Sequence, residues 1–504
     1  MANPSLQIGN SNWAIKEDNL LGYSTAGTRF VPQPITMTRA SAGTRVNSSG
    51  LVETVELLGS EEVTNGDFAT DSDWSLGSGW SIANQKATRN STGSYTNITQ
   101  GGILTVGKNY KVKFTVNEGS IGGVRIQLGG TYYGDYNGVG TYTIYGVSGA
   151  TAFNNFSLVG EPTFNGSISN VSVKESTKNN LARVDYDGTA SSLLVEPQRT
   201  NLVTYSSDFS QSYWTKQSGV TATYNTTETL SPDGTYNATK FIGNGSSGVL
   251  KSSISATGVV ARSVYLKSVT GTVNVKLKDP NATVTTLTLD VTTEWQRFDL
   301  TEDNGTAFQG LWIDDIPVSG IYMWGAQLEE GSYATSYIPT DGSTVTRVQD
   351  QYSKTGISNL INSEEGVLFV EMAVLAADTI NRYISLSNGT DDNSISFHFR
   401  NNTNNQVRVI LKSGNVNQFD STYNPSGSTA FAKVAFKYKV NDFALWVNGT
   451  EIATDTSGIT FSADTLNRLA FDDGQGGGKL FGKVKQLQVF KTALTDSELI
   501  ALTT

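Results

Sequence analysis

Apolar and polar residues alternate along most of this chain, in short runs separated by Gly and Asn. In the run 110–116, four side chains share one face and three share the other: Tyr110, Val112, Phe114 and Val116 against Lys111, Lys113 and Thr115. The stretches 124–128, 273–277 and 395–399 repeat the pattern. Because successive side chains of a strand point to opposite faces, such runs predict strands with one buried and one wet face. We therefore expect an all-β chain built of antiparallel sandwiches.

The alternation belongs to a plan that occurs twice. Asn-Gly-Asp-Phe at 65–68, followed by Trp74, corresponds to Ser-Ser-Asp-Phe at 206–209, followed by Trp214. Aromatic residues that recur at equivalent positions are typical of a core, although a sugar-stacking role is the alternative. Internal repetition predicts tandem modules of one fold, and we expect two jelly rolls, at 60–177 and 201–345.

A further sandwich is predicted for 346–504. Residues 367–372 are largely apolar on both faces, which is typical of a central strand. Asn448-Gly449 supplies the two residues of positive φ that a tight hairpin needs. Thr-Asp-Ser-Glu at 495–498 is a capping box and predicts one short helix near the end of the chain.

The stretch 180–202 marks a junction between modules. It has the same character as the stretch 38–53, which breaks off near Gly59. We interpret the two stretches as parts of one region, 1–59 continued by 178–200. The jelly roll at 60–177 is then an insertion into that region.

The first 59 residues are expected to be extended. Pro32 and Pro34 interrupt regular structure there. A segment of this kind cannot bury its own large apolar side chains, which are Trp13, Ile15 and Phe30. Packing against another copy is a stable solution, and we therefore expect a homo-oligomer.

Composition limits the classes of function. The formal net charge is −10 and the Lys and Arg residues do not cluster, so no nucleic-acid partner is expected. The sequence shows neither a secretory signal nor a membrane-spanning run, so no membrane insertion is expected. It contains no Cys, which excludes disulfides, thiolate zinc sites and cysteine nucleophiles.

Residues 38–53 and 180–202 together resemble the N-terminal signature of tailed-phage virion proteins of the head-spike-fibre or tail-fibre kind. The resemblance extends to Tyr-Ile-Pro-Thr at 337–340. It implies a structural protein that is made in the host cytoplasm, assembles with other virion proteins and projects from the virion surface. A fibre of this kind is expected to be a trimer.

Two further resemblances concern the sandwiches. The Asn-Gly-Asp-Phe start of the first jelly roll, its Asn-Val-Ser-Val at 170–173, and Trp-Gln-Arg at 295–297 of the second are similar to carbohydrate-binding jelly rolls. The hairpin 445–449, the run 482–490 and the segment 493–499 resemble the concanavalin A-like, laminin-G-like family. That fold hosts lectins, enzymes and structural modules, so the resemblance implies the fold rather than the function.

Candidate catalytic groups are few. His398 is the single histidine, and it faces away from the side of the strand that carries Phe397 and Phe399. The sequence lacks the nucleophile-elbow pattern that would accompany a Ser-His-Asp triad. Its acidic residues do not form the alternating carboxylate pair of a glycosidase, because Glu364 and Glu365 are adjacent. We therefore expect no enzymatic activity and no cofactor other than a possible calcium ion.

The acidic pair Asp472 and Asp473 is the candidate calcium site. It opens the Gly-rich stretch 472–478, and oxygen ligands on a flexible loop suit Ca²⁺. Asp391 and Asp392 form a second acidic pair. The alternative is a solvated turn whose acids keep the loop soluble.

Aromatic residues near turns are the candidate glycan platforms, because a flat ring covers the apolar face of a sugar. We select Tyr132, Tyr133, Tyr136 and Trp80. An ordinary exposed turn is the alternative for the tyrosines. The expected function is that of a virion fibre or spike that contacts host-surface glycan without cutting it. A secreted or cell-surface bacterial carbohydrate-binding protein is the second reading, and a glycan depolymerase the third.

Overall fold

The structure is a computed structural model, and it describes residues 2–9, 13–16, 20–25, 29–118, 120–149, 154–280, 286–303, 305, 308–376, 380–400, 406–424 and 430–504. Side chains are described within these ranges except at 13–34 and 400. The chain divides into two compact units, Glu56–Lys178 and the remainder, Met1–Val55 with Asn179–Thr504. Both are built of antiparallel sheets, so the predicted all-β fold class is confirmed.

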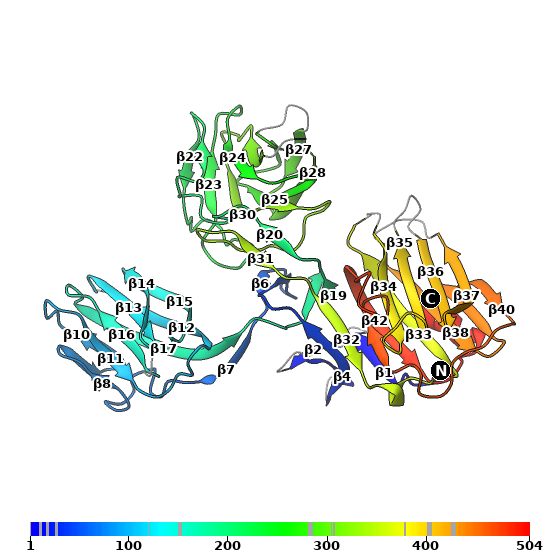
Figure 1. The fold of residues 1–504 in the computed structure, drawn as a ribbon. Coiled ribbons are helices and arrows are strands. Elements are labelled where there is room, and N and C mark those ends of the chain that lie inside the picture. The colour runs from blue at the N-terminus through cyan, green and yellow to red at the C-terminus, as the bar shows by residue number, and fades with distance from the viewer. Residues whose placement is uncertain are drawn as a thin grey trace. The chain divides into compact units, whose positions relative to one another are not determined.

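The unit Glu56–Lys178 is a two-sheet sandwich (Figure 1). One sheet has the order β15-β12-β17-β10-β9, with β7 also on β17, and the other the order β14-β13-β16-β11-β8. The strands are β7 (Leu57–Glu61), β8 (Ser75–Leu76), β9 (Trp80–Ala83), β10 (Lys86–Arg89), β11 (Thr96–Gln100), β12 (Asn109–Val116), β13 (Gly123–Leu128), β14 (Thr131–Asn137), β15 (Gly140–Val147), β16 (Phe156–Gly160) and β17 (Gly166–Thr177).

A second sandwich repeats this topology strand for strand. Its sheets have the orders β28-β25-β30-β23-β22 and β27-β26-β29-β24-β21. The strands are β21 (Thr215–Lys216), β22 (Thr221–Thr223), β23 (Thr239–Ile242), β24 (Val249–Ser255), β25 (Val260–Ser268), β26 (Val273–Lys278), β27 (Thr286–Val291), β28 (Gln296–Glu302), β29 (Phe308–Asp314) and β30 (Ile321–Glu330). The repeat seen in the sequence is therefore a repeat of fold.

Trp74 and Trp214 make equivalent contacts in the two sandwiches. Trp74 Nε1 donates to the carbonyl of Asn65 at 3.0 Å, and Trp214 Nε1 donates to the carbonyl of Tyr205 at 2.9 Å. Both rings are buried, each beside the Phe of its motif. A buried indole needs a partner for its N–H, and the turn before it supplies one in each case. The core interpretation of these residues is confirmed.

The C-terminal sandwich takes strands from both ends of the chain. Its first sheet contains β1 (Leu6–Gly9), β18 (Arg183–Asp187), β19 (Ala190–Val195), β33 (Glu365–Val374), β38 (Ala432–Lys439), β39 (Phe443–Val447), β40 (Thr450–Asp455) and β42 (Gly482–Phe490). Its second sheet contains β2 (Trp13–Lys16), β3 (Leu20–Thr25), β4 (Arg29–Thr38), β32 (Gln351–Thr355), β34 (Arg382–Ser387), β35 (Ser394–Arg400), β36 (Gln406–Ser413), β37 (Val416–Tyr423) and β41 (Arg468–Ala470).

Two short helices accompany these sheets. They are the 3₁₀ turn η1 (Ser358–Leu360) and the helix α1 (Asp496–Thr503). The predicted capping box is present, because Thr495 and Glu498 bond reciprocally at the start of α1. Within the described part of the chain, no helix is long and apolar enough to cross a membrane.

The N-terminal region is extended, and its strands join the sheets of the C-terminal sandwich. β1 pairs with β42, and β4 pairs with β32. Leu6, Ile8 and Met37 lie in the core of the C-terminal sandwich. Strand pairing satisfies the backbone hydrogen-bonding groups of this segment, and the same arrangement buries its apolar side chains. The side chains of Trp13, Ile15 and Phe30, on which the oligomer prediction rested, are outside the described residues.

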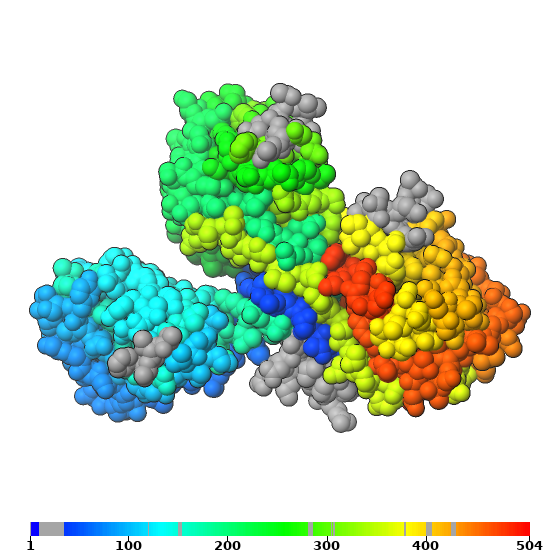
Figure 2. Space-filling view, in the orientation of Figure 1, coloured from blue at the N-terminus to red at the C-terminus, as the bar shows by residue number. Residues whose placement is uncertain are grey.

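The two junction stretches of the sequence lie against each other. Arg39 and Asn180 exchange hydrogen bonds, and the hairpin β5 (Thr44–Val46) with β6 (Val52–Thr54) contacts β18. The same hairpin region reaches the segment near residue 340, since Thr44 donates to the carbonyl of Tyr337. Figure 2 shows these N-terminal residues in blue against yellow-green ones.

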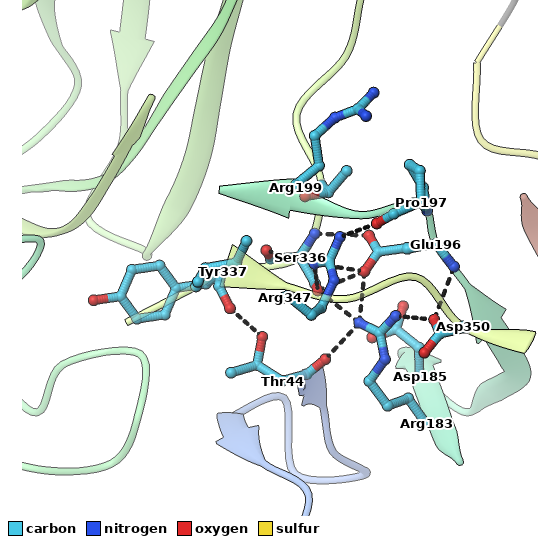
Figure 3. A network of polar contacts seen from close by, with 12 residues as sticks. Thr44, Arg183, Asp185, Glu196, Pro197, Arg199, Ser336, Tyr337, Arg347 and Asp350 are labelled. Atoms are coloured by element: carbon cyan, nitrogen blue, oxygen red, sulfur yellow. Dashed lines mark hydrogen bonds and ion pairs between the residues drawn. The ribbon is translucent and has the colours of Figure 1, made fainter. Parts of the chain in front are cut away.

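A buried ionic network ties the junction together (Figure 3). Glu196 accepts from Arg183 at 2.5 Å, and its carboxylate lies 2.9 Å from Arg347. Asp350 accepts from Arg39 at 2.8 Å and also from Arg183. All of these side chains are almost fully buried, so each charge depends on its partners. The nearby strands β20 (Arg199–Asn201) and β31 (Val345–Arg347) pair and bring these segments together.

Electrostatic interactions keep Glu196 and Arg183 ionised. Burial alone would raise the pKa of Glu196, but the charges of Arg347 and Arg183 and the hydrogen bonds from Ser336 outweigh burial and lower that pKa. Burial would likewise lower the pKa of Arg183, but Asp350 and Glu196 raise it. Glu196 and Arg183 are therefore charged partners that compensate each other rather than neutralised groups.

Candidate functional site

A hollow of about 340 Å³ lies on the outer face of β34, β35 and β36 in the C-terminal sandwich. The hollow results from the alternation of side chains along these three strands. Ile384, Phe397 and Val409 point into the core, and the residues on either side of each point outward into the hollow or beside it. Its lining residues are Tyr383, Asp391, Ser394, Ser396, His398, Arg408, Ile410, Lys412, Asn417 and Asp473.

Register arranges the outward side chains in cross-strand rows. Tyr383, His398 and Arg408 form one row. Ser385, Ser396 and Ile410 form the next row, and Ser387, Ser394 and Lys412 form the third. Directly opposed residues in a sheet have neighbouring side chains, so each row is a contact set.

Small serine side chains make the floor of the hollow. Ser394 and Ser396 line it, and Ser385 and Ser387 lie beside them on β34. All four are buried. Among the described residues, the buried Ser385 Oγ has no hydrogen-bond partner. A floor of hydroxyls below larger walls suits a ligand that itself carries hydroxyl groups.

One wall is aromatic. The rings of Tyr383 and His398 have centroids 4.4 Å apart at an angle of 55°. His398 Nε2 lies 2.8 Å from Ser396 Oγ, so the histidine and the floor are hydrogen bonded. Tyr383 is half-buried, which leaves part of its ring available to a ligand. Aromatic rings of this kind stack on the apolar face of a sugar.

The other walls carry charged groups in pairs. Arg408 Nε donates to Asp420 at 2.6 Å, and the second guanidinium nitrogen also binds Asp420. The hydrogen bond from Arg408 lowers the pKa of Asp420, and the same bond raises the pKa of Arg408. Lys412 Nζ donates to Asp391 at 3.0 Å. The shifts of Arg408 and Asp420 both favour the ionised pair.

The Gly-rich loop forms the remaining edge. Gly478 has φ +49°, and a Cβ there would lie 2.2 Å from the ring of Tyr383. A residue with a side chain would therefore displace Tyr383 or the loop. Asp473 shapes the loop, since its Oδ1 accepts from the backbone N–H of Gln475 at 3.0 Å and of Gly477 at 2.9 Å.

This loop differs from the predicted calcium site. Asp472 is bound by Arg468 through two nitrogens, at 2.8 and 2.6 Å, and it also accepts from the N–H of Gly474. A calcium loop requires carboxylates that converge on one cation, whereas here the arginine already neutralises Asp472. No group of three or more His, Cys, Asp or Glu side chains suited to a metal occurs in the part of the chain that the structure describes. The solvated-turn alternative agrees better with Asp473.

The predicted glycan platforms do not form one surface. Trp80 lies in the core of the sandwich 56–178, with 7% of its surface exposed and its ring 6.0 Å from that of Phe164. Tyr133 and Tyr136 are half-buried and pack against the same core. Tyr132, with 57% of its surface exposed, is the one whose ring faces solvent. Alternation along β14 explains the difference between Tyr132 and Tyr133.

Sequence reasoning missed most of the hollow. It considered His398 as a catalytic candidate, Asp391 as part of an acidic pair and Asp473 as a calcium ligand, and it did not select Tyr383, Ser396, Arg408 or Lys412. The available signal was the alternation of β35 and β36, whose outward positions carry polar or charged residues at every step except Ile410. The register that places Tyr383 beside His398 is a tertiary property.

Residues 368–500 match a family described as the Concanavalin A-like lectin/glucanases superfamily. The C-terminal domain is concanavalin A-like. Among solved structures, part of this chain is similar to the Ruminococcus gnavus IT-sialidase CBM40, with 22% identity over 28% of this chain and 84% of that one, at a TM-score of 0.25. Part of this chain is also similar to domain 4 of AbnA, a GH43 extracellular arabinanase from Geobacillus stearothermophilus, with 13% identity over 35% of this chain and 84% of that one, at a TM-score of 0.26. No match is found among curated proteins.

Proposed function

We propose that this protein binds glycans without cutting them, through the hollow of its concanavalin A-like domain. The observation that carries the proposal is the row Tyr383, His398 and Arg408 above a floor of buried serines. The row offers a ring for the apolar face of a sugar, and the floor and the charged walls offer donors and acceptors for its hydroxyl groups. The superfamily description, which includes lectins, agrees with this use of the fold.

The charged groups of the hollow favour binding over hydrolysis. A glycosidase needs one carboxyl group that is protonated at working pH and a second that is not. Asp391 is bonded to Lys412, and Asp473 accepts two backbone N–H groups. Both carboxylates are therefore already engaged by groups of the protein, and neither is left free for a ligand's leaving group.

We further propose that the protein works as an oligomeric fibre or spike on the virion surface, together with other virion proteins. The support is the resemblance of residues 38–53 and 180–202 to phage fibre proteins. A trimer would present three hollows to one host surface, and such multivalency raises avidity far above the affinity of a single site. Tyr132 is retained as a second glycan contact in the sandwich 56–178.

Retention on immobilised host-surface polysaccharide tests the binding site. Tyr383→Ala should reduce retention by roughly tenfold or more, because stacking of one ring contributes on this scale. Tyr132→Ala removes the second proposed contact, in the other unit, and should have the smaller effect. Thermal melting of both variants should show that they are folded. Loss of retention in Tyr132→Ala alone would move the site to the sandwich 56–178.

Two further measurements test the rest of the proposal. New reducing ends released from the polysaccharide would overturn the non-enzymatic function. Sedimentation of the full-length protein should give the mass of three 54.0 kDa chains, and a monomer at micromolar concentration would contradict the trimer. Capsid, portal or tail genes beside the gene would support the virion role, and their absence would favour the bacterial carbohydrate-binding alternative.

A further inference from the structure

Each cation around the hollow is already paired with a carboxylate of the protein. The two cations of the hollow, Arg408 and Lys412, are each bound to a carboxylate, Asp420 and Asp391 respectively. Asp473 also lines the hollow, and its partners are backbone N–H groups rather than a cation. With Asp420, which is bound to Arg408 but lies outside the lining, three carboxylates stand against two cations. The described groups of the hollow therefore carry more negative than positive charge.

The guanidinium of Arg408 is the group that would otherwise recognise an acidic sugar. A free guanidinium binds a carboxylate through two parallel hydrogen bonds. In Arg408 that fork already holds both oxygens of Asp420, and Asn417 adds a bond to the same carboxylate at 3.2 Å. An acidic ligand could bind this fork through two parallel hydrogen bonds only by displacing Asp420, which would then lose its cationic partner.

From these contacts we infer that the hollow selects neutral glycans and rejects glycans that carry a carboxylate. This inference rests on the proposed function. A neutral sugar can donate hydroxyl hydrogens to Asp391 and Asp473. It can also accept hydrogen bonds from the outer guanidinium nitrogen of Arg408 and from Lys412 Nζ without disturbing either ion pair. A sialic or uronic acid would instead place a like charge beside Asp473. Selectivity then comes from an unfavourable contact with the wrong ligand as well as from a favourable one with the right ligand.

Matched oligosaccharide pairs test the inference with the full-length protein. Each pair contains a neutral oligosaccharide and the same oligosaccharide extended by one sialic or glucuronic acid residue. Isothermal titration should show the acidic member binding at least about tenfold more weakly, because like-charge contacts strongly disfavour a wrong partner. Equal or tighter binding of the acidic member would overturn the selectivity and leave the proposed function standing. If neither member of any pair binds, both the proposed function and the inference are refuted.

Charge variants provide the second arm. Asp420→Asn frees the fork of Arg408 and should shift the preference towards the acidic member of each pair. Asp135→Asn breaks the comparable exposed pair with Arg125 in the sandwich 56–178 and should leave the preference unchanged. If Asp420→Asn leaves the preference for the neutral member unchanged, the result contradicts the role assigned to the Arg408–Asp420 pair. Asp391→Asn, which frees Lys412, repeats the test at the other wall.

Discussion

Arg183 and Glu196 approach to 2.5 Å in a part of the junction where both side chains are almost fully buried. The Glu196 carboxylate also accepts a hydrogen bond from Ser336 and lies beside Arg347, so it contacts three segments of the chain. Each of these segments comes from a different stretch of the sequence, and Glu196 is the residue that all of them share (Figure 3).

Removing the charge of Glu196 should destabilise the larger unit. Glu196→Gln keeps the size of the side chain but leaves Arg183 and Arg347 short of a counter-charge. Breaking a buried ion pair from one side costs about 3–5 kcal/mol, and we expect the unfolding free energy to fall by that amount. Urea unfolding measures the loss. Glu228→Gln, at the exposed pair with Lys240, is the control and should hardly change the midpoint. Equal effects of the two variants would contradict the role of the network.

The lowered pKa of Glu196 predicts that the stability of the larger unit depends on pH. The folded-state pKa of Glu196 lies below that of an unfolded glutamate, which is about 4.3. Its contribution to stability is therefore fully present above the unfolded pKa and is lost as the pH falls through the folded pKa. Wild-type stability should decline with acid below about pH 5 more steeply than that of Glu196→Gln. Urea midpoints across this range check the prediction, and parallel curves would refute it.

Excision of the inserted sandwich should leave the larger unit folded. β7 and β17 pair near the two ends of the insertion, with Leu57 opposite Thr177. Outside it, the N–H of Val55 bonds to Gly43 and the N–H of Asn180 bonds to Arg39, so both flanks are held by the larger unit. A chain that joins Val55 to Asn179 should therefore keep its β spectrum and a cooperative melt. Segment 56–178 expressed alone provides the complementary test. Insoluble expression of the joined chain would show that the larger unit depends on the insertion.

Gly478 should be sensitive to a single methyl group. Gly478→Ala combines a positive φ with a Cβ that clashes with Tyr383, and the expected cost is about 2–5 kcal/mol together with weaker glycan retention. Gly476→Ala is the matched control, since its φ is +106° and its Cβ would meet nothing within 4 Å. It should cost about 1–2 kcal/mol through the backbone alone and leave retention unchanged. Urea unfolding and retention measure both variants, and identical losses would contradict the contact with Tyr383.

The sequence by itself determined the fold class and the repeat, because strand alternation and turn residues are local signals. Tyr110 and its neighbours, the Trp74 and Trp214 motifs and the capping box at Thr495 each act within a few residues, so their effects can be read along the chain. Pairing between distant segments leaves no such trace. Only the tertiary structure decided that β1 joins β42, that Arg468 neutralises Asp472, and that Tyr383 stands beside His398 and Arg408. These outcomes depend on strand register between segments far apart in sequence, and register is set by the packing of whole sheets rather than by the residues of any one strand.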